Sequence, residues 1–158
     1  MWWTADEWSA MTDADSCGMC NDMHLEENEH SVLIGSTPAA HTRIARNQAH
    51  RGYSLVILRD HVTDLADLSP EQLLAFWSDV QRAGSAIAAT FEPRKIDYLV
   101  MGHRMPHLHC HVFPQHSEHD PTRNVDISDG PDFRPIEMLR ADARALRAAW
   151  ERFGTPPG

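Results

Sequence analysis

The segment from His107 to Pro114, with the sequence HLHCHVFP, constrains the fold of this chain more than any other. Its three histidines alternate with Leu108, Cys110 and Val112. An extended strand would therefore place all three imidazoles on one face and the apolar side chains on the other. This alternation predicts a half-buried strand within a sheet. An imidazole can bind a metal, attack phosphorus or give up a proton near neutral pH, so a row of imidazoles on a rigid strand also indicates a chemical site.

Composition limits the classes of protein to which the chain can belong. Its 158 residues suit one domain with a sizeable core. A formal net charge of −9 argues against binding a nucleic-acid polymer through a broad basic surface, but it leaves room for a small anionic ligand in a locally positive pocket. The N-terminus lacks the pattern of a signal peptide, and no stretch approaches the length of a membrane span. Because the three cysteines do not read as a secreted disulfide framework, we expect a cytoplasmic protein without membrane contact.

Apolar periodicity and helix-capping patterns predict five strands and three helices. The expected strands cover residues 31–36, 42–47, 53–59, 95–101 and 107–113. The expected helices cover residues 5–11, 70–90 and 135–153, the second opened by the capping sequence SPEQ at 69–72. Residues 117–134 carry Pro, Asp, Gly and Asn without periodicity, which predicts a loop. Strands with inserted helices indicate an α+β fold.

Three segments resemble the histidine triad (HIT) family of nucleotide hydrolases and transferases. The segment 107–114 resembles its His-x-His-x-His signature, and 52–61 is similar to its Gly-His-x-Leu-Val-Ile-Pro-Lys-x-His strand. Residues 95–103 are similar to the strand and turn before the signature. The resemblance implies a five-stranded, mostly antiparallel sheet with a long inserted helix and a C-terminal helix, usually in a homodimer. We expect an N-terminal extension with a short helix at 1–16, a HIT core at 17–120, and a loop and C-terminal helix at 121–158 packed on the same domain.

The resemblance also assigns chemistry to the triad. The middle histidine, His109, would form a covalent nucleotidyl-imidazole intermediate at the α-phosphorus, and His111 would hydrogen-bond the oxygens around phosphorus. Candidate substrates are dinucleoside polyphosphates, nucleoside phosphoramidates and adenylated small molecules, with no organic cofactor. A nucleotidyltransferase would use the same intermediate with another acceptor. A non-catalytic nucleotide-binding or interaction module is a further alternative, although pure binding needs no exposed nucleophile.

A second site is indicated by the Cys17-x-x-Cys20 pair. Taken alone, such a pair is often a redox motif or a coincidence. One branch of the HIT family, with the related sugar-nucleotide uridylyltransferases, builds a structural zinc site from such a pair and two histidines. One of these histidines follows the apolar strand, and the other is the first of the triad. The corresponding residues here are His61 and His107, so the resemblance implies Zn²⁺ as a scaffold. Unliganded thiols and a thiol redox function are the alternatives.

The resemblance finally implies positions for nucleotide contacts. Asn47 aligns with a ribose-binding acidic or amide residue, but a turn-forming Asn explains it equally well. Gly102 and His103 follow the fourth strand, and His103 stands where many relatives have an Asn that contacts phosphate; an exposed turn histidine is the alternative. Gln115 stands where Arg is frequent, which weakens the case for a long polyphosphate substrate. Residues that could replace that cation are Arg51, Arg104, His116 and His119.

Overall fold

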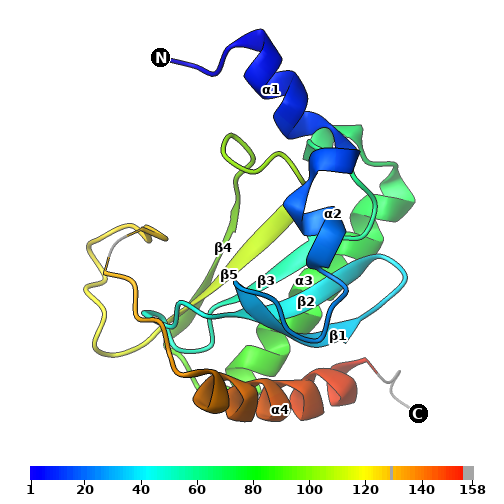
Figure 1. Cartoon of the computed structure of the whole chain (residues 1–158). Coiled ribbons are helices and arrows are strands. Elements are labelled where there is room, and N and C mark those ends of the chain that lie inside the picture. Colours follow the sequence, from blue (N-terminus) through cyan, green and yellow to red (C-terminus); the bar gives the residue numbers. More distant parts are fainter. Residues whose placement is uncertain (129, 155–158) are drawn as a thin grey trace.

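Five strands form one sheet in which every neighbouring pair is antiparallel (Figure 1). The computed structural model describes residues 1–128 and 130–154. The strand order is β1-β2-β3-β5-β4. The strands are β1 (Ser31–Ser36), β2 (Ala40–Ala45), β3 (Ser54–Leu58), β4 (Lys95–Val100) and β5 (His109–Gln115). The predicted α+β fold with a five-stranded antiparallel sheet is confirmed, and the predicted strand boundaries differ from the observed ones by at most two residues.

The helices begin where the sequence supplies caps. They are α1 (Ala5–Thr12), α2 (Gly18–Asp22), α3 (Pro70–Phe91) and α4 (Ile136–Phe153), with short 3-10 turns at Ala14–Ser16 and Leu65–Asp67. At the start of α3, the Ser69 hydroxyl accepts the Gln72 N–H at 3.2 Å, and the Gln72 side chain accepts the Ser69 N–H at 3.0 Å. This reciprocal capping box satisfies two donors that would otherwise lack partners in the helix. None of the described helices is long and apolar enough to cross a membrane.

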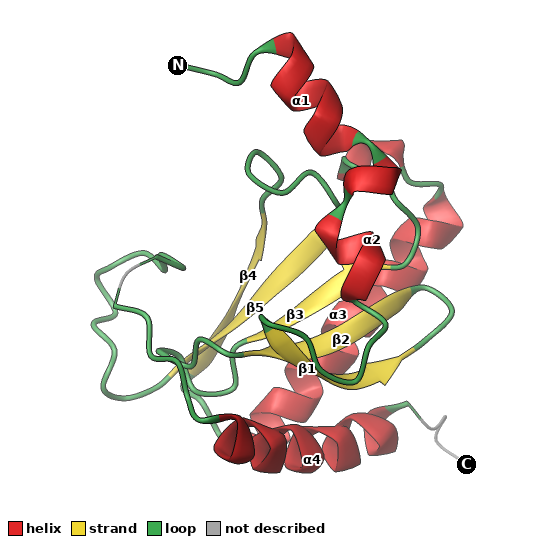
Figure 2. Cartoon of the chain, in the orientation of Figure 1, coloured by secondary structure: helices red, strands yellow, loops and turns green. Residues whose placement is uncertain are grey.

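One face of the sheet is covered by α3 and α4, which lie behind and below the strands in Figure 2. The core between them includes Leu108, Cys110 and Val112, as the alternating pattern predicts. The triad histidines therefore point to the opposite face, and all three are buried there. The strand predicted at 107–113 begins two residues later than expected, at His109, because the backbone N–H groups of His107 and Leu108 donate to the carbonyls of Met105 and Val62, outside the named strands.

Arg43 on β2 holds the N-terminal segment against this opposite face. Its guanidinium is fully buried and donates to the carbonyls of Met23 and Leu25, each at 2.6 Å, and to Ser31. These bonds fix the chain that joins α2 to β1. The Arg43 N–H groups thus serve as hydrogen-bond donors to backbone carbonyls in this stretch, a role that backbone N–H groups play within a helix or strand.

Substituting Arg43 with Met should therefore destabilise the segment 22–31 by more than the change in side-chain volume alone would cause. Buried carbonyls left without donors cost about 1–3 kcal/mol each, and we expect a loss of about 3 kcal/mol in the free energy of unfolding. Urea denaturation measures this value. Arg46→Met is the control, since its guanidinium donates to a single carbonyl, that of Glu29 at 3.4 Å. Equal losses for the two variants would contradict the role given to Arg43.

Candidate active site and metal site

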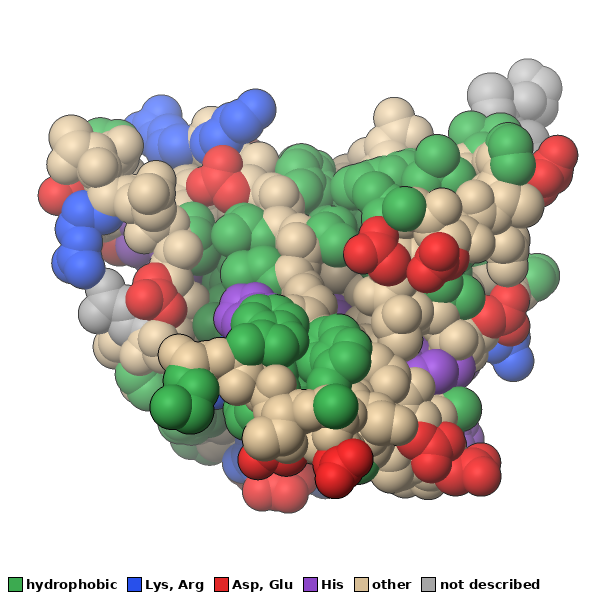
Figure 3. Space-filling view, turned by 90° about the horizontal axis from the view of Figure 1, so that it is seen from above, with side chains coloured by type: hydrophobic (Ala, Val, Ile, Leu, Met, Phe, Trp, Pro, Cys, Tyr) green, Lys and Arg blue, Asp and Glu red, His purple; other side chains and the backbone are tan. Residues whose placement is uncertain are grey.

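A cavity of about 1290 Å³ lies on the face of the sheet that α3 and α4 leave uncovered. Its floor is formed by side chains of β3 and β5 and the residue before β3. They are Tyr53, Leu55, Ile57, His109 and His111. Figure 3, seen from above, shows hydrophobic side chains near the middle of the view with a histidine patch beside them, and Arg or Lys side chains at the upper left. The volume is ample for a nucleotide and an attached group.

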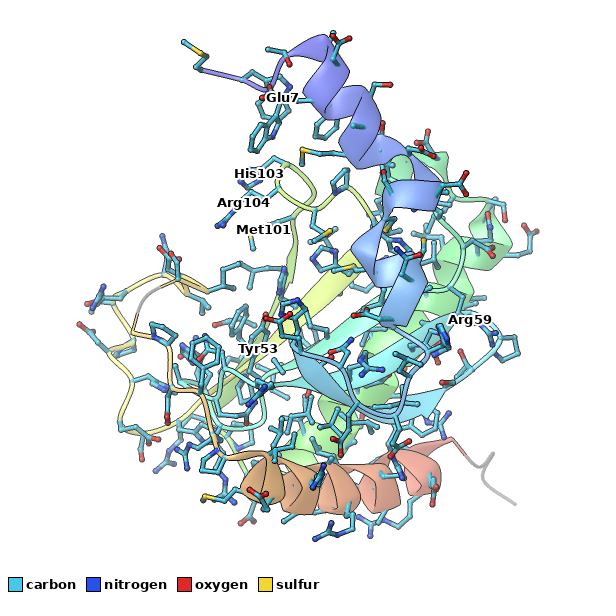
Figure 4. All side chains as sticks on the ribbon, viewed as in Figure 1. Glu7, Tyr53, Arg59, Met101, His103 and Arg104 are labelled. Carbon is cyan, nitrogen blue, oxygen red and sulfur yellow. The ribbon has the colours of Figure 1, made fainter. Side chains whose placement is uncertain are left out.

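Three parts of the chain wall this cavity. The N-terminal part contributes Gly18, Met19, Asp22, Asn28, His30 and Ser31. The β4–β5 turn contributes Met101, His103, Arg104 and Met105. The loop after β5 contributes the run from Arg123 to Ser128. In Figure 4, the labelled side chains of Met101, His103 and Arg104 extend from the turn toward the side on which that loop lies. The turn is also tied to the N-terminus, because the Trp3 indole N–H donates to the His103 carbonyl at 2.8 Å.

The proton positions on the triad follow from one backbone carbonyl. His109 Nδ1 lies 2.6 Å from the carbonyl oxygen of His107, so Nδ1 carries the proton and Nε2 keeps its lone pair. His111 Nε2 lies 3.1 Å from His109 Nε2, and therefore it must be the donor in that contact. His111 Nδ1 is then an acceptor, and the Tyr53 hydroxyl donates to it at 2.7 Å. The result is an unprotonated nitrogen of His109 at the cavity floor.

Burial keeps these two imidazoles neutral. It lowers the pKa of His109, although the bond to the His107 carbonyl acts in the opposite direction. Burial, together with the neighbouring His109, lowers the pKa of His111 to about 3. At pH 7 the Nε2 of His109 is therefore available as a nucleophile, and His111 can offer a hydrogen bond to an oxygen bound nearby.

A second cluster lies beside the triad. The side-chain ligand atoms of Cys17, Cys20, His61 and His107 all lie within 4.8 Å of one another. Cys20 Sγ lies 3.3 Å from His61 Nδ1 and 3.4 Å from His107 Nδ1, and Cys17 Sγ lies 3.4 Å from the same His107 nitrogen. Zinc bonds of about 2.3 Å to sulfur and about 2.0 Å to nitrogen, at a tetrahedral angle, would separate S and N by about 3.5 Å. The cluster could therefore bind a four-coordinate metal with little movement.

The far ring nitrogens support the same interpretation. His61 Nε2 lies 2.8 Å from the Thr12 carbonyl oxygen, and His107 Nε2 lies 2.7 Å from that of Leu58. Each Nε2 is therefore the protonated nitrogen, which leaves both Nδ1 lone pairs directed at the sulfurs, as in a ligand shell. Burial and the adjacent Cys17 raise the pKa of the Cys20 thiol to about 11. A bound cation would stabilise the thiolate and so offset the free-energy cost of ionising this thiol.

Two of the residues predicted to contact a nucleotide are not among those that line the cavity. Asn47 and Gly102 are absent from its wall, whereas His103, His109 and His111 line it. The Asn47 amide oxygen instead accepts the N–H of Ala49 at 3.1 Å and that of Asp132 at 3.0 Å. The Asn47 side chain thus holds a turn and the loop after β5, and its contact with a ribose stays a prediction.

The structure also shows which of the residues that could replace an arginine at position 115 lie at the cavity. Gln115 is not part of the cavity wall and donates to Asp97 at 2.9 Å. Arg51 pairs with Asp142 at 3.3 Å, and neither it nor His116 or His119 is part of the cavity wall. Arg104 does line the cavity.

Sequence reasoning missed several residues that line the cavity, above all Tyr53 and Arg123. Tyr53 could have been found, since it replaces the His of the Gly-His-x-Leu-Val-Ile pattern. Arg123 had no such signal, because it lies in a loop without periodicity and its position depends on the tertiary fold.

Known proteins share this architecture. A family model described as "HIT domain" matches residues 26–118, which is more than half of the chain. "Protein hit" from Bacillus subtilis strain 168 is 23% identical over 131 residues, covering 73% of this chain and 90% of that protein. A histidine triad protein from Bradyrhizobium japonicum has a TM-score of 0.70 at 19% identity, covering 81% of this chain and 96% of that one. A zinc-bound histidine triad family protein from Mycobacterium smegmatis has a TM-score of 0.64 at 23% identity, covering 89% of this chain and 96% of that one.

The two solved structures show the same fold, and the family model covers both the apolar strand β3 and the triad. Family, fold and the alternating histidines thus agree. The chain belongs to the histidine triad family.

Proposed function

We propose that this protein is a nucleotide hydrolase that cleaves at the α-phosphorus of a nucleotide derivative through a covalent nucleotidyl-histidine intermediate. The observation that carries the proposal is the unprotonated Nε2 of His109 at the floor of the cavity, with its Nδ1 proton held 2.6 Å from the carbonyl oxygen of His107. A neutral imidazole both attacks phosphorus and leaves it readily, so it can carry a nucleotidyl group between two half-reactions.

In the first half-reaction, a bond forms between His109 Nε2 and the α-phosphorus, while the bond from phosphorus to the leaving group breaks. The leaving group takes that electron pair. The imidazole becomes cationic and keeps its proton on Nδ1, which donates to the His107 carbonyl oxygen. In the second half-reaction, water attacks phosphorus and gives up a proton to solvent, the nitrogen–phosphorus bond breaks, and the electron pair returns to Nε2. His111 and His103 would donate hydrogen bonds to the phosphoryl and leaving-group oxygens, where charge develops.

We propose that the metal is zinc and that its role is structural. Cys17, Cys20, His61 and His107 would hold it, and its charge would stabilise the two thiolates while joining the N-terminal segment to the triad. Two thiolates and two imidazoles form one of the usual ligand sets of a closed zinc site, which supports this choice over a catalytic metal.

A homodimer forms part of the proposal. Apolar side chains remain exposed on α3 and on the edge strand β4. They are Leu74, Trp77, Tyr98 and Val100. An exposed apolar surface along an unpaired strand edge is the kind of surface that a second copy of the chain covers.

The leaving group is expected to be anionic. Arg104 from the β4–β5 turn and Arg123 from the loop after β5 both line the cavity. Hydrogen bonds from Ser128 lower the pKa of the Asp126 carboxyl most, and the charges of Arg104 and Arg123 lower it further. These cations stand in for the arginine that Gln115 replaces. Phosphoanhydrides such as dinucleoside polyphosphates are therefore the favoured substrates.

Substituting Arg104 with Ala should raise KM for diadenosine tetraphosphate about tenfold and leave KM for adenosine phosphoramidate within about twofold. The reason is that one charge-assisted contact to a phosphate contributes about 1.5 kcal/mol. Steady-state kinetics on the two substrates measure the difference. Arg51→Ala is the matched control, since this arginine lies outside the cavity wall. An equal change in KM for both substrates would contradict a contact with the leaving group.

Hydrolysis in ¹⁸O-labelled water tests the proposed reaction. Attack at the α-phosphorus places one ¹⁸O atom in the mononucleotide product, whereas attack on a distal phosphorus places it in the other fragment. We expect the label in the mononucleotide, read by mass spectrometry. Label in the distal fragment, or no turnover of any phosphoanhydride or phosphoramidate nucleotide, would overturn the proposal.

A further inference from the structure

Tyr53 occupies an unusual place beside the triad. It immediately precedes β3 and is buried, and its hydroxyl lies 2.7 Å from His111 Nδ1. Its ring stacks on Phe113, with centroids 4.1 Å apart and planes 10° from parallel. It also lies nearly parallel to the His111 ring, at 24°. With both the ring and the hydroxyl constrained, the oxygen has little freedom to leave His111.

The direction of this hydrogen bond is fixed by the rest of the network. His111 must carry its proton on Nε2, because the facing Nε2 of His109 is a lone pair. His111 Nδ1 can then only accept, so the Tyr53 hydroxyl is the donor. Burial raises the pKa of that hydroxyl, which keeps it protonated in any assay near neutral pH.

We propose that Tyr53 is a positioning residue for the phosphorus chemistry: its hydroxyl holds the His111 ring with Nε2–H aimed at His109. This inference rests on the proposed function for its effect on rate, but not for the proton positions themselves. A hydrogen bond accepted at one ring nitrogen polarises the imidazole and changes the strength of the N–H on the opposite side of the ring.

The consequence appears when His109 reacts. Once its Nε2 bonds to phosphorus, that nitrogen can no longer accept from His111. The His111 N–H then becomes free to donate to a phosphoryl oxygen in the transition state. Tyr53 itself makes and breaks no covalent bond. Its loss should therefore lower kcat and leave substrate binding unchanged.

Tyr53→Phe removes only the hydroxyl, and Tyr98→Phe, at the only other tyrosine in the chain, is the matched control. We expect kcat to fall on the order of 10- to 100-fold in Tyr53→Phe, with KM within about twofold. The ¹⁵N chemical shifts of the His111 ring should also move away from those of a fixed Nε2–H form. Tyr98→Phe should change neither. Tyr53→His, which restores a donor, should recover part of the rate.

The ¹⁵N spectrum separates the two proposals. If His111 keeps its wild-type ring shifts in Tyr53→Phe, the inference about Tyr53 is wrong. It is equally wrong if Tyr53→Phe retains the wild-type kcat. If the wild-type protein turns over no nucleotide substrate, the proposed function fails, and the spectrum alone then decides whether Tyr53 sets the form of His111. Melting curves of each variant exclude a general loss of folding as the cause.

Discussion

Replacing His109 with Ala is expected to abolish formation of the nucleotidyl intermediate and to lower kcat/KM by at least about 10⁴-fold. The variant loses the unprotonated nitrogen at the cavity floor, and among the described residues that line the cavity only His111, His103 and His30 carry another imidazole. The proton of His111 is already placed on the nitrogen that faces His109, so His111 cannot take over the attack without changing its tautomer. Intact-mass analysis after an alkaline quench should show a mononucleotide adduct on the wild type alone.

The affinity for a mononucleotide must be measured as well as the turnover rate, because loss of a buried imidazole could also change the shape of the cavity. We expect the mononucleotide dissociation constant of His109→Ala to stay within about tenfold of the wild-type value by calorimetry. His24→Ala, at an exposed histidine outside the cavity wall, should keep both adduct and turnover. An adduct on His109→Ala would place the nucleophile on another residue.

Removing the metal, or substituting Cys20 with Ser, is expected to cost about 5 kcal/mol of stability and to lower Tm by about 10–20 °C. The four ligands join α2 and the segment after β3 to the start of the triad, so losing the ion releases all three at once. Because the carbonyl of His107 also holds the Nδ1 proton of His109, activity should fall through kcat. Scanning calorimetry of protein with and without chelator measures the stability change.

Elemental analysis supplies the control for this second experiment. We expect one zinc ion per wild-type chain and none bound stably by Cys20→Ser. Cys110→Ala should retain the full metal content, since this third cysteine is buried in the core on the other face of the sheet. A metal-free wild-type protein with an unchanged Tm would rule out the structural role.

Much of the fold can be predicted because its signals are local. The capping box at Ser69 and Gln72 forms as the sequence indicates, and the alternation at residues 107–113 places imidazoles and core side chains on opposite faces. The sequence does not predict helix α2. This helix has five residues, too few to show periodicity, and it begins after Cys17, whose sulfur accepts the Cys20 N–H.

The candidate site is predictable only where its residues lie close together in sequence. The spacing of the three triad histidines and of the Cys-x-x-Cys pair is visible in the sequence and predicts a chemical site and a metal site. Alignment assigns Asn47 to the ribose, yet the loop after β5 engages its amide, and no local pattern indicates such a long-range contact. Arg123 reaches the cavity for the same reason, through the course of a loop that the sequence leaves open.

The three walls of the cavity differ in how they relate to the family. Residues 18–22 and 123–128 both lie outside the region that the HIT model matches, whereas the reactive floor lies inside it. Under the proposed function, the contacts to the leaving group would come from both sides of this boundary, because Arg104 lies inside the matched region and Arg123 lies outside it. Exchanging the loop after β5 between relatives would then change the Arg123 contact while Arg104 and the triad imidazoles stay in place. We expect such an exchange to shift leaving-group preference in part and to leave the nucleophile unchanged.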